Sequence, residues 1–441
     1  MEAELHDVGR ELAAAFPSHT LHPMRALDEK AMEMSTRDRE LRAALFRLVD
    51  VTPACRSLDD LARHLAGYLG EVEEKPQPLR AAMRMADSAA GRRALGGAAA
   101  AGVRHMARRF IVAESPRAAR SDLRELWSDG VATSLDLLGE ATVTEAEADR
   151  YAERCAEALD TLAETTPRWP DRELLERDSI GPIPRANLSV KVSALTPLMR
   201  PDAPDIGRED AARRLRPLLA RARDTGAHLH IDMESVDSLE TTLDLVIELL
   251  DEEELRDGPS AGIVLQAYLR DSPAHLDRIL AWAESSARTP PVVVRLVKGA
   301  YWDHEVVEAR QHGWSPPVFE DKAECDRNFE ALTRRLLDAR PLVRVAIASH
   351  NLRSVAHAIA YNGSTEADDG DLELQVLRGL GDDLAHALGS KGFRVRAYCP
   401  VGEMVAGMAY LVRRLLENTA NESFLSEQAS GASLDDLLAP P

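Results

Sequence analysis

Aromatic residues make up only 4% of this 441-residue chain, although 45% of its residues are hydrophobic. A core must therefore consist mainly of Ala, Leu and Val. There is enough apolar material for two or three average domains, or for one large barrel with an added helical region. No stretch approaches the roughly 20 apolar residues of a membrane-spanning helix. The N-terminal MEAELHDVGREL lacks the features of a signal peptide. We expect a soluble, cytoplasmic protein without a transmembrane segment.

Cysteine is also scarce. Cys55, Cys155, Cys325 and Cys399 are widely separated, and no CxxC or CxxH spacing occurs. This spacing argues against a zinc knuckle, and four cysteines in a chain of this size suggest reduced thiols. We expect no metal site.

Excess positive charge is lacking as well. The formal net charge is −20, so a nucleic acid would be repelled unless a basic patch stood apart. The one locally basic segment, residues 80–109, has no interleaved aromatic residues that could stack on bases. We interpret it as an arginine-rich helical face and expect no nucleic-acid partner.

The first 127 residues contain only helical patterns. LRAALFRLVD and LDDLARHLAGYLGE carry apolar residues at helical spacing, and runs of β-branched residues are missing. The sequence therefore predicts an all-helical N-terminal arm over residues 1–127.

Strand-like segments then alternate with helical patterns. They are VATSLDLL (131–138), NLSVKVS (187–193), AHLHIDM (227–233), AGIVLQAY (261–268), PVVVRLV (291–297), LVRVAIAS (342–349), LELQVL (372–377) and FRVRAY (393–398). Such alternation is typical of parallel strands. Eight candidates predict an α/β fold, a (β/α)8 TIM-type barrel, over residues 128–426, followed by a C-terminal tail over residues 427–441.

Polar residues alternate with apolar ones within these strands. In NLSVKVS, for example, Leu188 and Val190 share one face while Asn187, Ser189 and Lys191 share the other. A barrel strand alternates between the outer helices and the interior, so the polar residues should point inward. Burying them is costly unless they bond to each other or to a ligand. We expect a polar site near the carboxyl ends of the strands.

The stretch VVVRLVKGAYWDHE (292–305) opens as a buried strand and ends in residues 298–302, which are Lys, Gly, Ala, Tyr and Trp. At the carboxyl end of a barrel strand, Gly299 would let the backbone approach a ligand, and the two aromatic rings could form a flat wall. An ordinary turn with a packed Trp fits the same residues.

EMVAGMAYLVRRLLEN (403–418) predicts a helix after the eighth strand. Opposite its apolar face, Tyr410, Arg413, Arg414 and Glu417 form one stripe. Two guanidinium groups at the barrel mouth would bind a small carboxylate. The stripe also fits a solvated face with an Arg413–Glu417 pair.

Taken together, SVKVSAL, HIDMES, IVLQAY, VRLVKGAYWD, ASHN and AYLVRRLLEN resemble, in this order and spacing, the proline dehydrogenase domain of the bifunctional proline utilization A flavoenzymes. The resemblance runs from about Leu135 to Phe424. It implies a barrel that holds FAD and oxidises L-proline to Δ1-pyrroline-5-carboxylate, with hydride passing to the flavin N5 and electrons to a quinone. No GxGxxG follows a strand, so the cofactor is expected from the resemblance alone.

The resemblance also implies roles for individual residues. The residues expected to be catalytic are Lys191, Asp232, Tyr398, Arg413, Arg414 and Glu417, and those expected to contact the substrate are Lys191, Ala300, Leu377, Tyr398, Tyr410, Arg413 and Arg414. Residues matching flavin-binding positions are Asp232, Met233, Gln266, Arg295, Val297, Lys298, Gly299, Ala300, Tyr301, Trp302, Ser349, His350, Gln375 and Glu417. A cation near the flavin ring would favour the anionic reduced flavin.

Two features depart from the family pattern. Arg378 and Leu380 stand where relatives more often carry an aromatic or His and a Met, which leaves a related cyclic amino acid open as substrate. Bifunctional relatives continue into an aldehyde dehydrogenase domain, whereas this sequence ends at Pro441. Coupling to a separate pyrroline-5-carboxylate (glutamate semialdehyde) dehydrogenase, and a peripheral membrane contact, stay open.

A hydrolase is the alternative from a different class. His228 and His230 alternate on one strand face, and an HxH at a barrel strand begins a metal site in many hydrolases. No further metal-ligand motif completes the set, so the two histidines are expected to bond within the barrel. A silent scaffold is disfavoured because it would not need Lys191, Asp232 and Tyr398 together.

Overall fold

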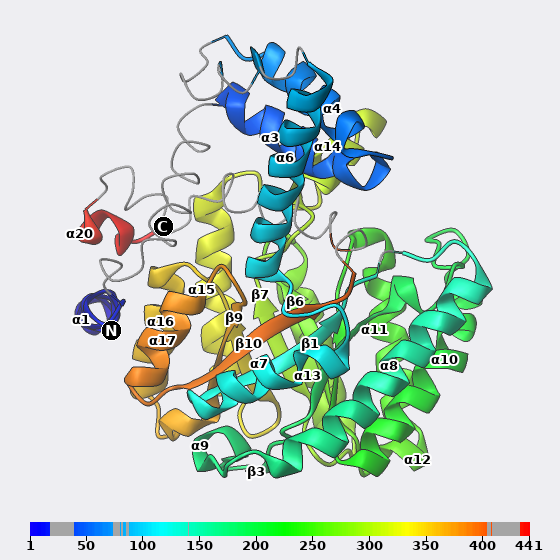
Figure 1. Ribbon diagram of the computed structural model, residues 1–441. Helices are drawn as coiled ribbons and strands as arrows, with labels where there is room; N and C mark the ends of the chain where they lie inside the picture. The colour runs from blue at the N-terminus through cyan, green and yellow to red at the C-terminus, as the bar shows by residue number, and fades with distance from the viewer. Residues whose placement is uncertain are drawn as a thin grey trace. The chain divides into compact units, whose positions relative to one another are not determined.

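The computed structural model describes residues 1–17, 39–73, 80, 83–84, 88–139, 141–403, 407 and 433–441 (Figure 1). The chain forms two compact units. The barrel unit comprises Met1–Phe16, Ser115–Val401 and Leu434–Pro441, and the helical unit comprises Pro17–Glu114 and Gly402–Ser433.

Eight parallel strands close into a barrel in the order β1-β10-β9-β8-β7-β6-β5-β4, with β1 paired to β4. They are β1 (Val131–Leu137), β4 (Asn187–Lys191), β5 (His228–Asp232), β6 (Ser260–Gln266), β7 (Val293–Val297), β8 (Arg344–Ala348), β9 (Leu372–Leu377) and β10 (Arg394–Val401). Each overlaps a segment predicted as a strand, although β6 begins one residue earlier and β10 ends three residues later than predicted, so the (β/α)8 prediction is confirmed.

Helices on the outside cover the barrel (Figure 1). They are α7 (Pro116–Ser128), α8 (Glu145–Thr165), α10 (Pro204–Thr225), α11 (Val236–Asp251), α12 (Glu253–Arg256), α13 (Ser272–Ser285), α15 (Lys322–Asp338), α16 (Leu352–Gly363) and α17 (Asp382–Ser390). Two further helices of this unit are the short α9 (Glu173–Glu176), before β2 (Arg177–Asp178), and α14 (Trp302–His312), after β7. Local signals fix the helix ends: Thr144 and Glu147 form a capping box at the start of α8, and Gly226, with φ of +66°, ends α10.

The strand register places the alternating residues as the sequence predicts. Asn187 lies opposite His228, and Lys191 lies opposite Asp232, across β4 and β5. Leu188 and Val190, of opposite parity, are fully buried. The polar residues bond to each other within the barrel, which is how this interior satisfies its hydrogen-bonding groups.

Both chain ends contribute to the barrel unit. Helix α1 (Glu2–Ala14) contacts α16, where Arg353 donates to the Glu2 carboxylate (Nη1–Oε1 2.6 Å) and to the carbonyl oxygen of Leu438, beside the short helix α20 (Leu434–Leu437). The sequence grouped residues 1–127 as one arm, whereas α1 and α7 belong to the barrel unit.

The described part of the helical unit contains α3 (Arg39–Val51), the short 3-10 helix η2 (Thr52–Ala54), α4 (Leu58–Gly70) and α6 (Ala89–Phe110). The predicted helical character of this region is confirmed. Its core is aliphatic, with Leu41, Leu48, Leu61 and Leu69 buried together. Among the described helices, none has the length and apolarity required to cross a membrane.

Candidate active site

A charged cluster lies at the carboxyl ends of the barrel strands. Its side chains are Asp136 of β1, Lys191 of β4, Asp232 of β5, Arg295 of β7 and Tyr398 of β10. Side chains two positions apart on a strand share a face, and these five belong to the face of each strand that points into the barrel. The barrel therefore brings together groups that are far apart in the sequence.

Asp232 lies at the centre of this cluster. Its Oδ1 accepts hydrogen bonds from the Arg295 guanidinium (Nη1, 2.8 Å) and from the Ser189 hydroxyl (2.8 Å), and its Oδ2 accepts one from the Tyr398 hydroxyl (2.6 Å). The Arg295 guanidinium also lies over the Tyr398 ring, 5.4 Å from its centroid. A carboxylate with three donors fixes the position of each of them.

Lys191 lies between two carboxylates. Its ammonium contacts Asp136 directly and lies 3.7 Å from Asp232 Oδ2 and 3.4 Å from the Tyr398 hydroxyl. Burial opposes the charged form, but the two carboxylates outweigh it and raise the pKa of Lys191. Burial and the same carboxylates raise the pKa of Tyr398 well above its usual range. At neutral pH the site therefore holds an ammonium and a phenol.

The residues after β7 explain the glycine in VKGAYWD. Gly299 has φ of +135°, and a Cβ at this position would lie 2.4 Å from the Tyr268 ring. The Tyr268 N–H donates to the Lys298 carbonyl oxygen (2.7 Å), and the Lys298 ammonium pairs with Asp326. The glycine is thus required first by a neighbouring ring rather than by a ligand.

Trp302 begins α14 and is 39% exposed. Its indole N–H donates to the carbonyl oxygen of Phe319 (2.8 Å). Met233 lies in the apolar cluster around Tyr268, and Val297 and Tyr301 pack against that cluster. Ala300 lies in the same turn after β7. The predicted flavin-binding residues of β5 and β7 are therefore grouped at one side of the barrel mouth.

Further predicted cofactor residues lie at the ends of β6 and β8. The Gln266 amide donates to the Glu234 carbonyl oxygen (2.9 Å). After β8, the His350 imidazole accepts from the N–H of Leu377 (Nε2, 2.9 Å), and the Ser349 hydroxyl accepts from the Asn351 N–H (3.1 Å).

Several buried polar atoms at the mouth have no hydrogen-bond partner among the described residues. They are Asp136 Oδ2, Gln266 Oε1, Tyr268 Oη and the Nε and Nη2 atoms of Arg295. An unpaired buried polar group is unfavourable, so such a set marks a place where a ligand or water completes the bonding. The donors and acceptors are mixed, which fits a heterocycle that carries both.

Gln375 and Arg378 have side-chain partners of their own. Gln375 bonds to Glu373 (Nε2–Oε1 2.6 Å) and lines a cavity at the opposite end of the barrel. Arg378, the departure from the family pattern, pairs with Asp382 (Nη1–Oδ2 2.8 Å), so its charge is already matched. Tyr410, Arg413, Arg414 and Glu417 lie outside the described residues.

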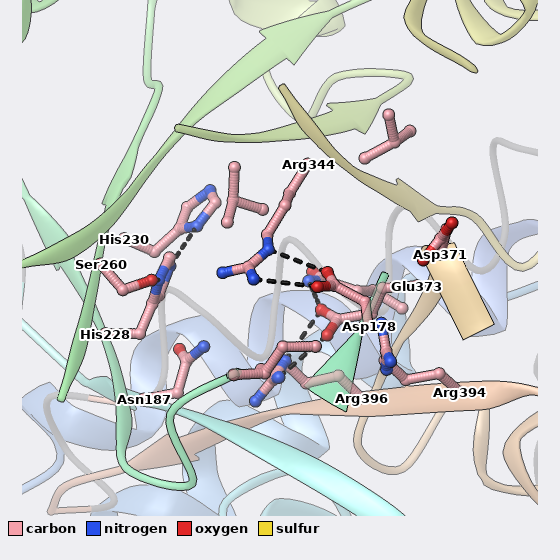
Figure 2. Close-up of a pocket in the computed structure, with 14 residues that line it drawn as sticks. Asp178, Asn187, His228, His230, Ser260, Arg344, Asp371, Glu373, Arg394 and Arg396 are labelled. Carbon is pink, nitrogen blue, oxygen red and sulfur yellow. Dashed lines mark hydrogen bonds and ion pairs between the residues drawn. The ribbon is translucent and has the colours of Figure 1, made fainter. Parts of the chain in front are cut away.

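Figure 2 shows the cavity at the amino ends of the strands. Ser260, His228 and His230 form a chain in it, with oxygen–nitrogen and nitrogen–nitrogen distances of 2.8 Å and 3.1 Å. Burial lowers the pKa of His228 to about 3. No third metal-ligating residue joins these histidines in the described part of the chain. The arrangement therefore favours the expected internal bonding over a hydrolase metal centre.

The same cavity holds buried ion pairs. Arg396 of β10 binds Glu373 of β9 through two hydrogen bonds (2.8 Å and 2.9 Å), and Arg344 of β8 binds Asp178 (Nη2–Oδ1 2.9 Å). Asp178 belongs to a small hairpin formed by β2 (Arg177–Asp178) and β3 (Gly181–Pro182). These contacts close the amino end of the barrel, where barrel enzymes keep stabilising residues rather than their sites.

Sequence reasoning missed Asp136. It lies in VATSLDLL, where Ser134 and Asp136 alternate with Leu135 and Leu137. This is the same parity that identified Lys191 on β4, so the signal was present. VATSLDLL alternates over only two polar residues, whereas the alternation in NLSVKVS is longer and therefore a stronger indication of an inward-facing polar side.

Comparisons with known proteins agree with this geometry. The family model for proline dehydrogenase matches residues 119–427, and that for the proline utilization A N-terminal domain matches residues 2–110. The chain is 34% identical over 347 residues to the bifunctional protein PutA of Salmonella typhimurium (77% of this chain, 25% of the relative). It is 27% identical over 329 residues to proline dehydrogenase 1 of Bacillus subtilis (74% and 92%).

A solved structure is also similar. The crystal structure of proline utilization A from Bdellovibrio bacteriovorus inactivated by N-propargylglycine matches with a TM-score of 0.90 and 34% identity, over 100% of this chain and 44% of that one. The chain thus spans about a quarter of the length of the bifunctional relatives it matches.

Proposed function

The chain belongs to the proline dehydrogenase family, and on that basis we propose that it oxidises L-proline to Δ1-pyrroline-5-carboxylate, the first step of proline breakdown to glutamate. The observation that carries this proposal is the cluster of Lys191, Asp232, Arg295 and Tyr398 at the carboxyl ends of the strands. Barrel enzymes place their sites there. A site for a small zwitterion needs fixed charges of both signs, because a pyrrolidine ring offers few other groups to recognise.

The substrate carboxylate is assigned to the cationic side of the site. Lys191 keeps its charge at neutral pH because Asp136 and Asp232 raise its pKa. Its ammonium forms ion pairs with both aspartates. Tyr398, Ala300 and Leu377 are assigned to the wall around the ring. Arg413 and Arg414, with Glu417 ordering them and Tyr410 on the wall, complete the site as it is expected from the family motif.

FAD is the proposed cofactor of this flavin-dependent family. The unpartnered atoms Gln266 Oε1 and Arg295 Nη2 supply an acceptor and a donor, which suits the mixed polar edge of a flavin ring. Bound there, the flavin supplies a two-electron acceptor for the hydrogen of the ring carbon beside the nitrogen. Lys298, Trp302 and His350 are assigned to the remainder of the cofactor.

In this proposal the chain's own residues hold the site in one geometry and provide the charge that favours the reaction. Asp232 fixes Arg295 and Tyr398 through short hydrogen bonds, so both present one geometry before substrate arrives. Tyr398 donates and does not act as a base, because its pKa is raised. Arg295 places a buried positive charge beside the reacting centre, which favours negative charge developing on the cofactor side.

Anaerobic titration tests the proposal. The purified chain, supplied with FAD if it is isolated without it, is mixed with L-proline, and the visible spectrum is recorded. Loss of the oxidised flavin absorbance on adding proline is the expected result. If the absorbance is fully retained with L-proline but lost with another cyclic amine, that amine is the substrate and the reaction class stands. A protein that binds no flavin would overturn the proposal.

A quinone is the proposed electron acceptor. Steady-state turnover with proline and a water-soluble quinone should regenerate oxidised flavin faster than air does. The product is a reactive imine in equilibrium with its open aldehyde, so an aldehyde-oxidising dehydrogenase is the expected consumer. The named bifunctional relatives are consistent with such coupling.

A further inference from the structure

Three metal-ligating side chains converge in the helical unit. Cys55 follows η2, and Asp60 and His64 belong to α4. The Cys55 Sγ, a carboxylate oxygen of Asp60 and an imidazole nitrogen of His64 all lie within 4.8 Å of one another, and the three side chains are half-buried. Within the ranges that the structure describes, this is the one set of three or more such groups.

The backbone around these residues is well defined by local hydrogen bonds. Ser57 caps α4, since its hydroxyl accepts from the Asp60 N–H (3.1 Å). Asp60 and His64 are four residues apart on α4 and so lie on the same helical face. The Cys55 N–H donates to the Thr52 carbonyl oxygen (3.2 Å), which closes the 3-10 turn η2, whose C-cap is Cys55.

Each of the three side chains keeps an atom that can coordinate a cation. The Asp60 carboxylate accepts from the Arg56 N–H (3.2 Å) and from Arg63 (3.3 Å), and each oxygen retains a further lone pair. The Cys55 thiol points to the Val51 carbonyl oxygen (3.4 Å). In the described chain, His64 has a ring contact with Tyr68 and no hydrogen bond at either nitrogen.

We infer that Cys55, Asp60 and His64 form a binding site for a zinc-type divalent cation. Sulfur, nitrogen and oxygen ligands suit tetrahedral zinc, and three protein ligands leave one position for water. On binding, the thiol releases its proton to solvent and its sulfur forms a bond to the metal. The thiolate and the carboxylate then balance the two charges of the cation, while the Arg56 N–H orients the carboxylate from behind.

This inference departs from the expectation of no metal site. The spacing C-x4-D-x3-H is not a common cysteine–histidine motif, and it becomes a ligand set only when η2 turns the chain back onto the first turns of α4. A bound ion would tie that turn to α4, so the role we assign to it is to stabilise the helical unit.

Cobalt titration of the full chain tests the site. After treatment with a chelator, the protein is titrated with Co²⁺ and difference spectra are recorded at wavelengths longer than the flavin absorbs and in the near ultraviolet. One equivalent should give the visible bands of a tetrahedral cobalt ion and a thiolate-to-cobalt charge-transfer band, and Zn²⁺ should remove both. Chelation should lower the thermal midpoint and Zn²⁺ should restore it.

Matched variants assign the ligands. Cys55→Ser should abolish the charge-transfer band, and Asp60→Asn and His64→Gln should each weaken Co²⁺ binding by at least about 100-fold, since loss of even an outer-shell partner costs 10- to 100-fold. Asp59→Asn changes the neighbouring carboxylate, which pairs with Arg92 instead, and should leave binding unchanged. The inference is overturned if the band persists in Cys55→Ser, if Asp59→Asn and Asp60→Asn bind equally, or if the unaltered chain shows no tetrahedral spectrum.

Discussion

The guanidinium of Arg295 and the carboxylate of Asp232 meet inside the barrel at 2.8 Å (Nη1–Oδ1), although 63 residues separate them in the chain. Arg295 is 4% exposed. A buried cation is tolerated only when paired, and the same aspartate also holds Tyr398. The pair therefore determines where positive charge stands in the proposed site, while two other guanidinium atoms stay available to a ligand.

Asp232→Asn should slow the proposed reaction strongly while the protein still folds. The amide keeps the size of the side chain but removes the negative charge opposite Arg295 and Lys191. Misplacing these groups should lower kcat/KM for L-proline by about 100-fold. Anaerobic flavin reduction by L-proline, followed in a stopped-flow instrument, measures the change.

Asp210→Asn is a matched control for that variant. Asp210 is also buried, and it accepts from Thr196 (2.6 Å) and from Arg214 (3.0 Å) on the outer helix α10. It should lose comparable stability and keep its rate of flavin reduction. If Asp232→Asn and Asp210→Asn reduce flavin at equal rates, Asp232 has no role in the proposed site.

Asp136→Asn should change the pH dependence of ligand binding. Asp136 is one of three carboxylates, with Asp232 and Glu234, that raise the Lys191 pKa above its usual value of 10.5 against the effect of burial. Without it, only Asp232 and Glu234 oppose the effect of burial, so the Lys191 pKa falls and Lys191 loses its charge at a lower pH than in the unaltered chain. Cyclopentanecarboxylate, which lacks an amine of its own, should therefore bind progressively more weakly as the pH rises.

The measurement is a titration of that ligand between about pH 7 and about pH 10, below the ordinary lysine pKa. The flavin spectrum reports binding. In this pH range Lys191 of the unaltered chain stays charged, so the affinity of that chain for cyclopentanecarboxylate should not fall through loss of that charge. Identical pH profiles for the two proteins would contradict the assigned role of Asp136.

Much of the fold could be predicted from the sequence because its signals are local. All eight strands were found from runs of apolar residues and from alternating parity, and the inward orientation of Lys191 and Asp232 follows from that parity. The boundary of the helical arm could not be found in this way. Helix α1 belongs to the barrel unit through Arg353, a residue of α16 more than 300 positions away, and no local pattern encodes such a contact.

The site was predicted in part. Parity shows that a side chain points inward, but not which inward groups pair or at which end of the barrel a cavity opens. Thus the bond of Gln375 to Glu373 was not foreseen, and its role in binding the cofactor stays a prediction. The pairing of Lys191 with Asp136 depends on the closure of β1 against β4, which is a property of the whole barrel.

Gly299→Ala should damage the barrel mouth. Its φ of +135° is a conformation that a side chain disfavours by about 1–3 kcal/mol, and the new methyl group would also overlap the Tyr268 ring. The turn that carries Lys298 and Trp302 would have to move. We expect a lower free energy of unfolding and loss of bound flavin, measured by urea denaturation and by the flavin-to-protein absorbance ratio.

Gly313→Ala separates strain from overlap. Gly313 ends α14 with φ of +69°, and nothing lies within 4 Å of an added Cβ. This variant should lose about 1 kcal/mol from the left-handed conformation and retain flavin. Full flavin content in both variants would show that the turn after β7 does not hold the cofactor.

Glu373→Gln should flatten the acid side of the stability profile. Burial raises the pKa of Glu373, but the guanidinium of Arg396 outweighs burial, and the net effect lowers that pKa from 4.5 to about 2. A carboxyl group with a lowered folded-state pKa stabilises the fold above its unfolded pKa, and this stabilisation is lost as the pH falls through the folded-state pKa. The contribution near neutral pH is roughly 3 kcal/mol.

Urea denaturation from neutral pH downward measures this effect. The free energies of unfolding of the unaltered chain and of Glu373→Gln should differ most above the unfolded pKa of 4.5 and should converge as the pH falls toward about 2. Salt should change the difference little, because the pair is buried at the closed end of the barrel. A difference that stays constant with pH would mean that the two bonds to Arg396 contribute through shape and not through charge.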